Sequence, residues 1–340
     1  MQQLDPSIER DNLPRFPHAR KGHVESWFVR ANHPSRPLAV WLKITVLIPL
    51  KGQAVADVWA TTFNGESGVR FAAKTTRRLR PADFVGGLKI EVAGCFLHLH
   101  AGGGEARGRV DSGDEFVTWD LRWTRAEMGQ PMCLLPTRRM IEWPFPKSKL
   151  LTPTPLAHFS GTMSWSGEPV DAGGWWGMQG HNWFVEHSPG YCWGQCVFLG
   201  ADGQPVAVAE GFSGQIRVAG VKSPVMSALV VRRGGRTYRF DRLVDLWRQD
   251  AHRDDLTWVL RVSGRHGDAM IRMTAEASNM VCLGYANPDR SIAHCLNSKL
   301  AQVVLRVNPV NEEGFECVSE HGGALEFLQP QGDSRLPVVV

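Results

Sequence analysis

Short runs in which apolar and polar side chains alternate follow one another along most of this 340-residue chain. The run 38–49 shows the pattern, since Leu42 and Ile44 alternate with Lys43 and Thr45. Successive side chains of a strand point to opposite faces of its sheet, so a period of two predicts strands. Glycine, asparagine and aspartate separate the runs at short, fairly regular intervals. Together, the runs and their turns predict an all-β sandwich or barrel.

Two stretches depart from this pattern. Residues 296–307 have apolar positions that fit a helix or a strand, and the period alone does not separate the two. Residues 131–155 contain six prolines, which lack the backbone donor that strand pairing needs. A chain of this length favours two domains or one large β domain. We therefore place a domain connection in the proline-rich segment and divide the chain into residues 1–160 and 161–340.

Composition is that of an ordinary globular protein. Hydrophobic residues make up 43% of the chain and charged residues 21%, which excludes wholesale disorder. The net charge of +4 is small, and no nucleic-acid-binding motif accompanies the basic cluster Lys74, Arg77, Arg78 and Arg80. We expect no nucleic-acid partner.

The sequence predicts a cytoplasmic protein without stable membrane insertion. Residues 1–16 lack the apolar core of a signal peptide, and the longest apolar run, 40–50, is interrupted by Lys43 and is too short to span a bilayer. The seven cysteines are odd in number and scattered, so they form no disulfide framework.

We expect no metal and no cofactor. His98 and His100 share a strand face, but the sequence nominates no third ligand. Cys192 and Cys196 are four positions apart on a presumed strand, which is too far for one tetrahedral metal. The sequence also lacks a nucleophile elbow, a P-loop and a dinucleotide fingerprint.

Aromatic and titratable residues are concentrated in residues 175–187 and 191–196, which hold four tryptophans and two histidines. The break at residues 188–190 predicts two strands joined by a tight turn. Alternation would place His181 and Asn182 on opposite faces of the first strand. Large rings with a few polar tips suit a small-molecule pocket and suit the edge of a core equally well.

His181 and Glu186 form the best titratable pair for proton transfer, and we expect them to be catalytic. Alternatively, His181 is a hydrogen-bonded core residue and Glu186 faces solvent. Glu25 and Asp57 are the competing acids in the first half. The residues expected to bind a ligand carry large rings or polar tips: Trp176, Asn182, Trp183, Tyr191, Trp193, Gln195, Glu25, Trp27 and Asp57.

Several of these motifs resemble the hydroxyneurosporene synthase-like superfamily, which includes carotenoid 1,2-hydratases, AttH-like proteins, tocopherol cyclases and fungal pericyclases. The similar residues are Gly-His-Val-Glu-Ser-Trp at 22–27, Trp-Leu-Lys at 41–43 and Gly-Met-Gln-Gly-His-Asn-Trp at 177–183. Residues 285–288 and 295–299 are similar to a late motif of an uncharacterised bacterial branch.

The resemblance covers nearly the whole chain and implies two lipocalin-like β-barrel domains packed together around a hydrophobic pocket. In the hydratases, a Gly-His motif is followed by an aspartate that protonates an alkene. His181 matches that histidine, but the acid position falls near Val185 or Glu186, so the acid differs in kind. Trp193 matches an aromatic residue that could stabilise a carbocation.

Three hypotheses for function follow. The first is an enzyme that hydrates, cyclises or isomerises an apolar isoprenoid- or polyketide-like molecule. The second is a non-catalytic carrier or sensor of a hydrophobic ligand, and the third is a structural or partner-binding protein. The sequence leaves the choice between them, the ligand and the oligomeric state open.

Overall fold

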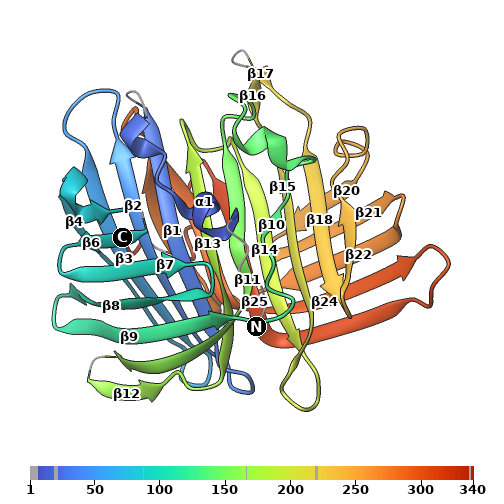
Figure 1. The fold of residues 1–340 in the computed structure, drawn as a ribbon, viewed down its shortest axis with the longest axis horizontal. Coiled ribbons are helices and arrows are strands. Elements are labelled where there is room, and N and C mark those ends of the chain that lie inside the picture. Colours follow the sequence, from blue (N-terminus) through green and yellow to red (C-terminus); the bar gives the residue numbers. More distant parts are fainter. Residues whose placement is uncertain (1–6, 19–21, 87, 166, 219–220, 337) are drawn as a thin grey trace.

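Two antiparallel β-sheets, each curled toward a barrel, stand side by side in the molecule (Figure 1). The structure is a computed structural model that describes residues 7–18, 22–86, 88–165, 167–218, 221–336 and 338–340. Strands make up 63% of the described residues and helices 6%. The predicted all-β fold of two packed barrels is confirmed.

The first sheet holds thirteen strands in the order β4-β3-β2-β1-β13-β11-β9-β8-β7-β6-β5, with β10 and β12 paired to β11. Its two ends approach each other where β4 contacts β8, so the barrel is nearly closed. The strands are β1 (His23–Asn32), β2 (Leu38–Ile48), β3 (Val55–Asn64), β4 (Val69–Arg78), β5 (Phe84–Val85), β6 (Lys89–Val92), β7 (Cys95–His100), β8 (Gly103–Ser112), β9 (Glu115–Arg125), β10 (Met132–Cys133), β11 (Lys149–Trp165), β12 (Glu168–Asp171) and β13 (Trp175–Phe184).

The second sheet holds ten strands in the order β19-β18-β15-β14-β25-β24-β22-β21-β20, with β23 paired to β24. A separate two-stranded ribbon is formed by β16 and β17. These strands are β14 (Tyr191–Leu199), β15 (Pro205–Gly214), β16 (Arg217–Val218), β17 (Val221–Lys222), β18 (Met226–Arg233), β19 (Arg236–Phe240), β20 (Asp250–Asp254), β21 (Thr257–Gly264), β22 (Gly267–Thr274), β23 (Val281–Ala286), β24 (Ile292–Pro309) and β25 (Phe315–Gln329).

Helices are short and lie outside the sheets: α1 (Ser7–Asn12) and the 3-10 turns η1 (Phe16–His18), η2 (Pro81–Asp83), η3 (Arg138–Ile141) and η4 (Ala277–Asn279). None of the helices in the described part of the chain is long and apolar enough to cross a membrane. The ambiguous stretch 296–307 lies within strand β24.

The predicted hairpin around residues 188–190 is wrong. Strand β13 pairs with β1 and β11 in the first sheet, whereas β14 pairs with β15 and β25 in the second. Residues 185–190 therefore carry the chain from one barrel to the other. The local turn signal is real, but long-range pairing decides the partner of each strand. The predicted boundary at residue 160 falls inside β11, which belongs to the first sheet.

The proline-rich segment 131–155 does not connect the two barrels either. It forms β10, the turn η3 and the start of β11, all on the side of the first sheet. Strand β11 accommodates Pro153 and Pro155 where its register with β13 shifts, between Leu151 and Ala157. Proline has no backbone N–H to donate in strand pairing. It is tolerated at a register shift because the regular hydrogen bonding between the strands is interrupted there.

Strand β1 is buried along its whole length because each of its faces packs against something different. Trp27 and Val29 point into the first barrel, whereas Phe28 belongs to a cluster shared with the second barrel. Arg30 also lies at the contact between the two barrels, which we call the seam. It donates hydrogen bonds to Asn32 Oδ1 at 2.6 Å, to the Gly322 carbonyl oxygen at 2.7 Å and to Gln195 Oε1. The seam thus fixes the two barrels against each other.

Candidate functional site

A cavity of about 420 Å³ lies between the two barrels. Most of its wall is apolar. Phe28 and Trp41 come from the first sheet, Trp193 and Phe212 come from the second, and Met140 comes from the proline-rich segment. A cavity of this size with a few convergent polar groups is typical of small-molecule sites.

The mouth of the cavity carries three large apolar side chains that remain about half exposed. Phe145, Leu243 and Trp247 line the cavity and have exposed fractions of 47%, 52% and 56%. They belong to connecting segments rather than to strands of the two barrels. An apolar molecule can therefore reach the cavity between side chains that have room to move.

The inner end of the cavity is polar and centres on Glu326 of β25. Its Oε1 accepts hydrogen bonds from Lys299 Nζ at 2.7 Å and from Asn297 Nδ2 at 2.9 Å. The Tyr191 hydroxyl lies 3.5 Å from Oε2. Burial raises the pKa of Glu326, but the Lys299 ammonium outweighs burial and the net pKa is lowered. Glu326 is therefore a carboxylate.

Lys43 of β2 is the second cation at this end. Its Nζ lies 4.2 Å from the centre of the Tyr285 ring and 5.5 Å from that of Trp41. Burial lowers the pKa of Lys43 to about 8, although the Glu326 carboxylate acts in the opposite direction. The ammonium can therefore exchange its proton near neutral pH more readily than an exposed lysine does.

His187, in the segment that links the barrels, also lines the cavity. Its Nδ1 lies 2.7 Å from Asn287 Oδ1, which accepts the His187 backbone N–H as well. Burial lowers the pKa of His187 to about 4, so the ring is neutral at pH 7. With the proton on Nδ1, the lone pair sits on Nε2, where it can accept a proton.

Glu210 of β15 lies behind the wall formed by Trp193. It accepts hydrogen bonds from Trp193 Nε1 at 3.0 Å and from Thr152 Oγ1 at 2.8 Å. Burial raises the pKa of Glu210 to about 7 in spite of these bonds. Its role is to hold the Trp193 ring in the cavity wall, since the described lining residues do not include Glu210 itself.

Of the residues predicted from the sequence to bind a ligand, the structure brings Asn182, Tyr191 and Trp193 to the cavity. Asn182 and Phe184 project from the opposite face of β13 to His181, and only the Asn182 face meets the second barrel. The predicted alternation along this strand is therefore confirmed, and the strand separates the cavity from the interior of the first barrel.

His181 lies on the far side of that strand and is fully buried. Its Nδ1 donates to the Asp11 carbonyl oxygen at 2.5 Å, and its Nε2 donates to Glu25 Oε1 at 2.8 Å. Both ring nitrogens therefore have hydrogen-bond partners within the fold. Trp27 stacks on the ring at 4.8 Å and donates to the Asn12 carbonyl oxygen.

Glu25 receives four hydrogen bonds. Besides His181, the donors are His23 Nε2 at 3.1 Å and the backbone N–H groups of Arg15 at 2.8 Å and Phe16 at 2.7 Å. Burial raises its pKa, but the bonds from His181 and His23 outweigh burial and lower it to about 2. The pair anchors the N-terminal segment to the barrel.

The other predicted residues also lie away from the described lining of the cavity. Glu186 is exposed in the linking segment, and Trp183 packs on His181 and under the Arg15 guanidinium. Asp57 accepts a hydrogen bond from Thr76 Oγ1 at 2.7 Å, and Gln195 belongs to the seam beside Arg30. Trp183, Asp57 and Gln195 thus have partners within the fold, whereas Glu186 is exposed.

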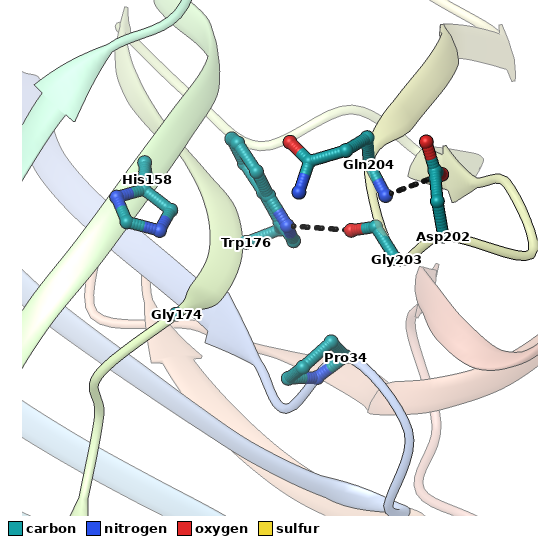
Figure 2. A pocket seen from close by; sticks show the side chains of 7 residues that line it. All are labelled: Pro34, His158, Gly174, Trp176, Asp202, Gly203 and Gln204. Carbon is teal, nitrogen blue, oxygen red and sulfur yellow. Dashed lines mark hydrogen bonds between the residues drawn. The ribbon is translucent and has the colours of Figure 1, made fainter.

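Trp176 belongs to a second hollow of about 500 Å³ on another part of the seam, shown in Figure 2. In this view Trp176 lies between His158 and Gln204, and Pro34 lies below them. Trp176 Nε1 donates to the Gly203 carbonyl oxygen at 3.2 Å, which ties the two barrels together. This hollow lacks the aromatic walls of the first cavity.

No group of three or more metal-ligating side chains occurs among the described residues. His98 Nδ1 instead lies 3.2 Å from Glu105, and the seven cysteines are free thiols. The absence of a metal and of a cofactor stays a prediction.

Sequence reasoning missed Lys43, His187, Tyr285 and Glu326. A signal existed for Lys43, because a lysine inside the apolar run 40–50 is costly unless it serves a purpose. Glu326 had no comparable signal, since only long-range pairing of β14 with β25 brings it beside Tyr191.

No family model matches the chain. An uncharacterized protein found in two strains of Mycobacterium tuberculosis is 24% identical over 303 residues, which cover 88% of this chain and 85% of that protein. A candidate AttH from Nitrosomonas europaea superposes with a TM-score of 0.53 at 13% identity, over 91% of this chain and 92% of its own. Kievitone hydratase from Nectria haematococca gives a TM-score of 0.53 at 11% identity, over 89% and 88%. The chain therefore shares its all-β fold with these two proteins.

Proposed function

We propose that this protein binds an apolar small molecule in the cavity between its barrels and catalyses a hydration, cyclisation or isomerisation by proton transfer. The observation that carries the proposal is the combination of apolar walls with an inner end holding Lys43, Tyr191, His187 and Glu326. An isoprenoid- or polyketide-like molecule fits such a cavity, because its apolar body replaces water along the walls. The likeness to a protein named as a hydratase supports a reaction of this class.

The acids of the proposed reaction are Tyr191 and Lys43. Burial raises the pKa of the Tyr191 hydroxyl well above its ordinary value, so this group keeps its proton at neutral pH. Proton transfer to an alkene forms a carbocation next to the acid. The Trp193 ring lines the cavity and can stabilise that cation through its face.

The base of the proposed reaction is His187. The bond to Asn287 fixes its proton on Nδ1, so Nε2 can accept a proton from an attacking water molecule. In a hydration, the alkene gains one proton from the acid and one hydroxyl from water, whose second proton passes to His187. A cyclisation or an isomerisation uses the same acid and returns a proton from carbon to the base.

The catalytic role expected for His181 and Glu186 stays a prediction, and we propose His187 and Tyr191 instead because these residues reach the cavity. A carrier would use the same cavity without chemistry. If the protein binds isoprenoids or polyketides but converts none of them into a product, a carrier is favoured. With kievitone, the product of a hydration would be heavier by one water molecule.

Blocking the cavity tests the proposal. Ala228 of β18 lines the cavity beside Phe212, so Ala228→Phe should fill it. We expect the neutral fluorescent dye N-phenyl-1-naphthylamine to bind the wild-type protein, and Ala228→Phe to weaken binding by about tenfold or more, the equivalent of ~1.4 kcal/mol. Fluorescence titration measures both dissociation constants.

Val206→Phe is the matched control, because it adds the same ring at an exposed position of the neighbouring strand β15. Its dye affinity should equal that of the wild type. Equal affinity in Ala228→Phe and the wild type, with both folded, would contradict binding in this cavity.

A further inference from the structure

We propose that the inner end of the cavity binds an anionic oxygen group of the ligand, a carboxylate or an enolate, with Lys43 as its counter-ion. This inference rests on the proposed function, because it assigns a subsite within the same cavity. It goes further by naming the chemical class of the ligand, which would be an apolar molecule that ends in an acidic group.

The charges at the inner end of the cavity do not balance. Glu326 is paired with Lys299 at 2.7 Å and accepts a second bond from Asn297. In the part of the chain that the structure describes, no carboxylate forms an ion pair with Lys43 and no group accepts a hydrogen bond from its Nζ. Two ammonium groups thus share one carboxylate, and an anionic ligand would complete the set.

Two buried polar atoms at the cavity lack a strong hydrogen-bond partner among the described residues. The Tyr285 hydroxyl and the Asn182 side-chain oxygen are buried, and both side chains line the cavity. Among the described residues, the Asn182 oxygen makes no hydrogen bond, and the Tyr285 hydroxyl has only the weakly bonding Cys295 thiol as a partner. Leaving a buried polar group unpaired is costly. A ligand oxygen at this end would accept from the Tyr285 hydroxyl and, once the amide turns, from the Asn182 NH₂ group.

Aromatic rings surround Lys43. The rings of Trp41, Trp59 and Tyr285 lie around its ammonium, at 5.5, 5.8 and 4.2 Å from Nζ. These rings exclude water, and an ion pair is stronger in such a medium than at an exposed surface. A cationic ligand would meet two ammonium groups here and would be rejected.

A pair of dyes tests the inference. N-phenyl-1-naphthylamine and 1-anilinonaphthalene-8-sulfonate share one ring framework and differ by a sulfonate, which stands in for the carboxylate. We expect the wild type to bind the sulfonate more tightly than the neutral dye. Lys43→Met should weaken binding of the sulfonate dye by about tenfold or more and change the affinity for the neutral dye by less than about twofold.

Three further variants serve as controls. Lys43→Arg keeps the charge and should keep the preference for the sulfonate. Lys74→Met removes a neighbouring lysine that also lies near Trp59 but is not among the described lining residues. This substitution should leave the affinities for both dyes unchanged. Ala228→Phe should weaken the binding of both dyes, and this result would exclude binding at the exposed surface.

The outcomes separate the two proposals. If neither dye binds the wild type, the proposed function and this inference both fail. If the neutral dye binds in the cavity while the sulfonate binds no more tightly, only the anion subsite is overturned. If Lys43→Met weakens the binding of both dyes equally, the anion subsite is overturned as well.

A measurement on the wild type keeps the inference testable if Lys43→Met does not fold. The charged or titratable groups facing Lys43 are Asp57 of β3, His187 of the linking segment, Tyr285 of β23, Cys295 and Lys299 of β24, and Glu326 of β25. Burial lowers the pKa of Lys43 to about 8, so the ammonium loses its proton as the pH rises through this value. The preference for the sulfonate should fall between about pH 7 and pH 9. A preference that is unchanged over this range would overturn the subsite.

Discussion

Replacing Glu25 by alanine is expected to lower the free energy of unfolding by about 3–5 kcal/mol, the cost of removing one partner from a buried ion pair. The substitution leaves His181 Nε2 and the N–H groups of Arg15 and Phe16 without their partner. His181→Ala should destabilise the protein in the same direction, because it leaves the carboxylate short of one donor. In both variants, dye binding should follow the folded fraction. Urea unfolding and dye titration, run side by side, measure the two quantities.

One control accompanies this prediction. Glu186→Gln changes an exposed side chain and should stay within about 0.5 kcal/mol of the wild type. A fully stable His181→Ala protein that no longer binds the dye would contradict a structural role and would restore His181 as a candidate catalytic residue.

The stability of the protein at acid pH should also depend on Glu25. The pKa of Glu25 is lowered from 4.5 to about 2 in the folded protein, so its contribution to stability is complete above pH 4.5 and is lost as the pH falls toward 2. The shift corresponds to roughly 3 kcal/mol. In Glu25→Gln this part of the loss should be missing from the pH profile.

His187→Asn is expected to reduce turnover by about 10²–10⁴-fold, the usual contribution of a general base. The asparagine can still donate to Asn287, but it lacks the Nε2 lone pair that accepts the proton from water. Dye affinity should change little, since the apolar walls are intact. Turnover of kievitone, or of another isoprenoid or polyketide that the wild type converts, is measured by mass spectrometry of the product.

His158→Asn is the matched control for that variant, because His158 lies exposed beside the hollow of Figure 2. Its turnover should equal that of the wild type. A loss in His158→Asn together with full activity in His187→Asn would move the site to that hollow.

The sequence predicts the strands well because each barrel strand has one face in a core. The run 38–49 became β2, Leu38–Ile48, since Leu42 and Ile44 fill the first barrel. Which strands pair could not be predicted in the same way. The turn at residues 188–190 looks like a hairpin locally, yet β13 and β14 find other partners whose apolar faces complete two separate barrels.

The site was predicted only in part for a related reason. Asn182, Tyr191 and Trp193 reach the cavity because alternation along β13 and β14 is a local property. Lys43 and Glu326 meet them through pairing over long distances in the sequence. The motif at 285–288 does contain Tyr285 and Asn287, but nothing local shows that these side chains face a cavity.

A crystal structure with 1-anilinonaphthalene-8-sulfonate bound tests the central claim most directly. The account predicts electron density for the rings between Phe28, Trp193 and Phe212, with the sulfonate beside Lys43 Nζ and the Tyr285 hydroxyl. Density for the dye inside the first barrel beside His181, or in the hollow beside Trp176, would contradict it.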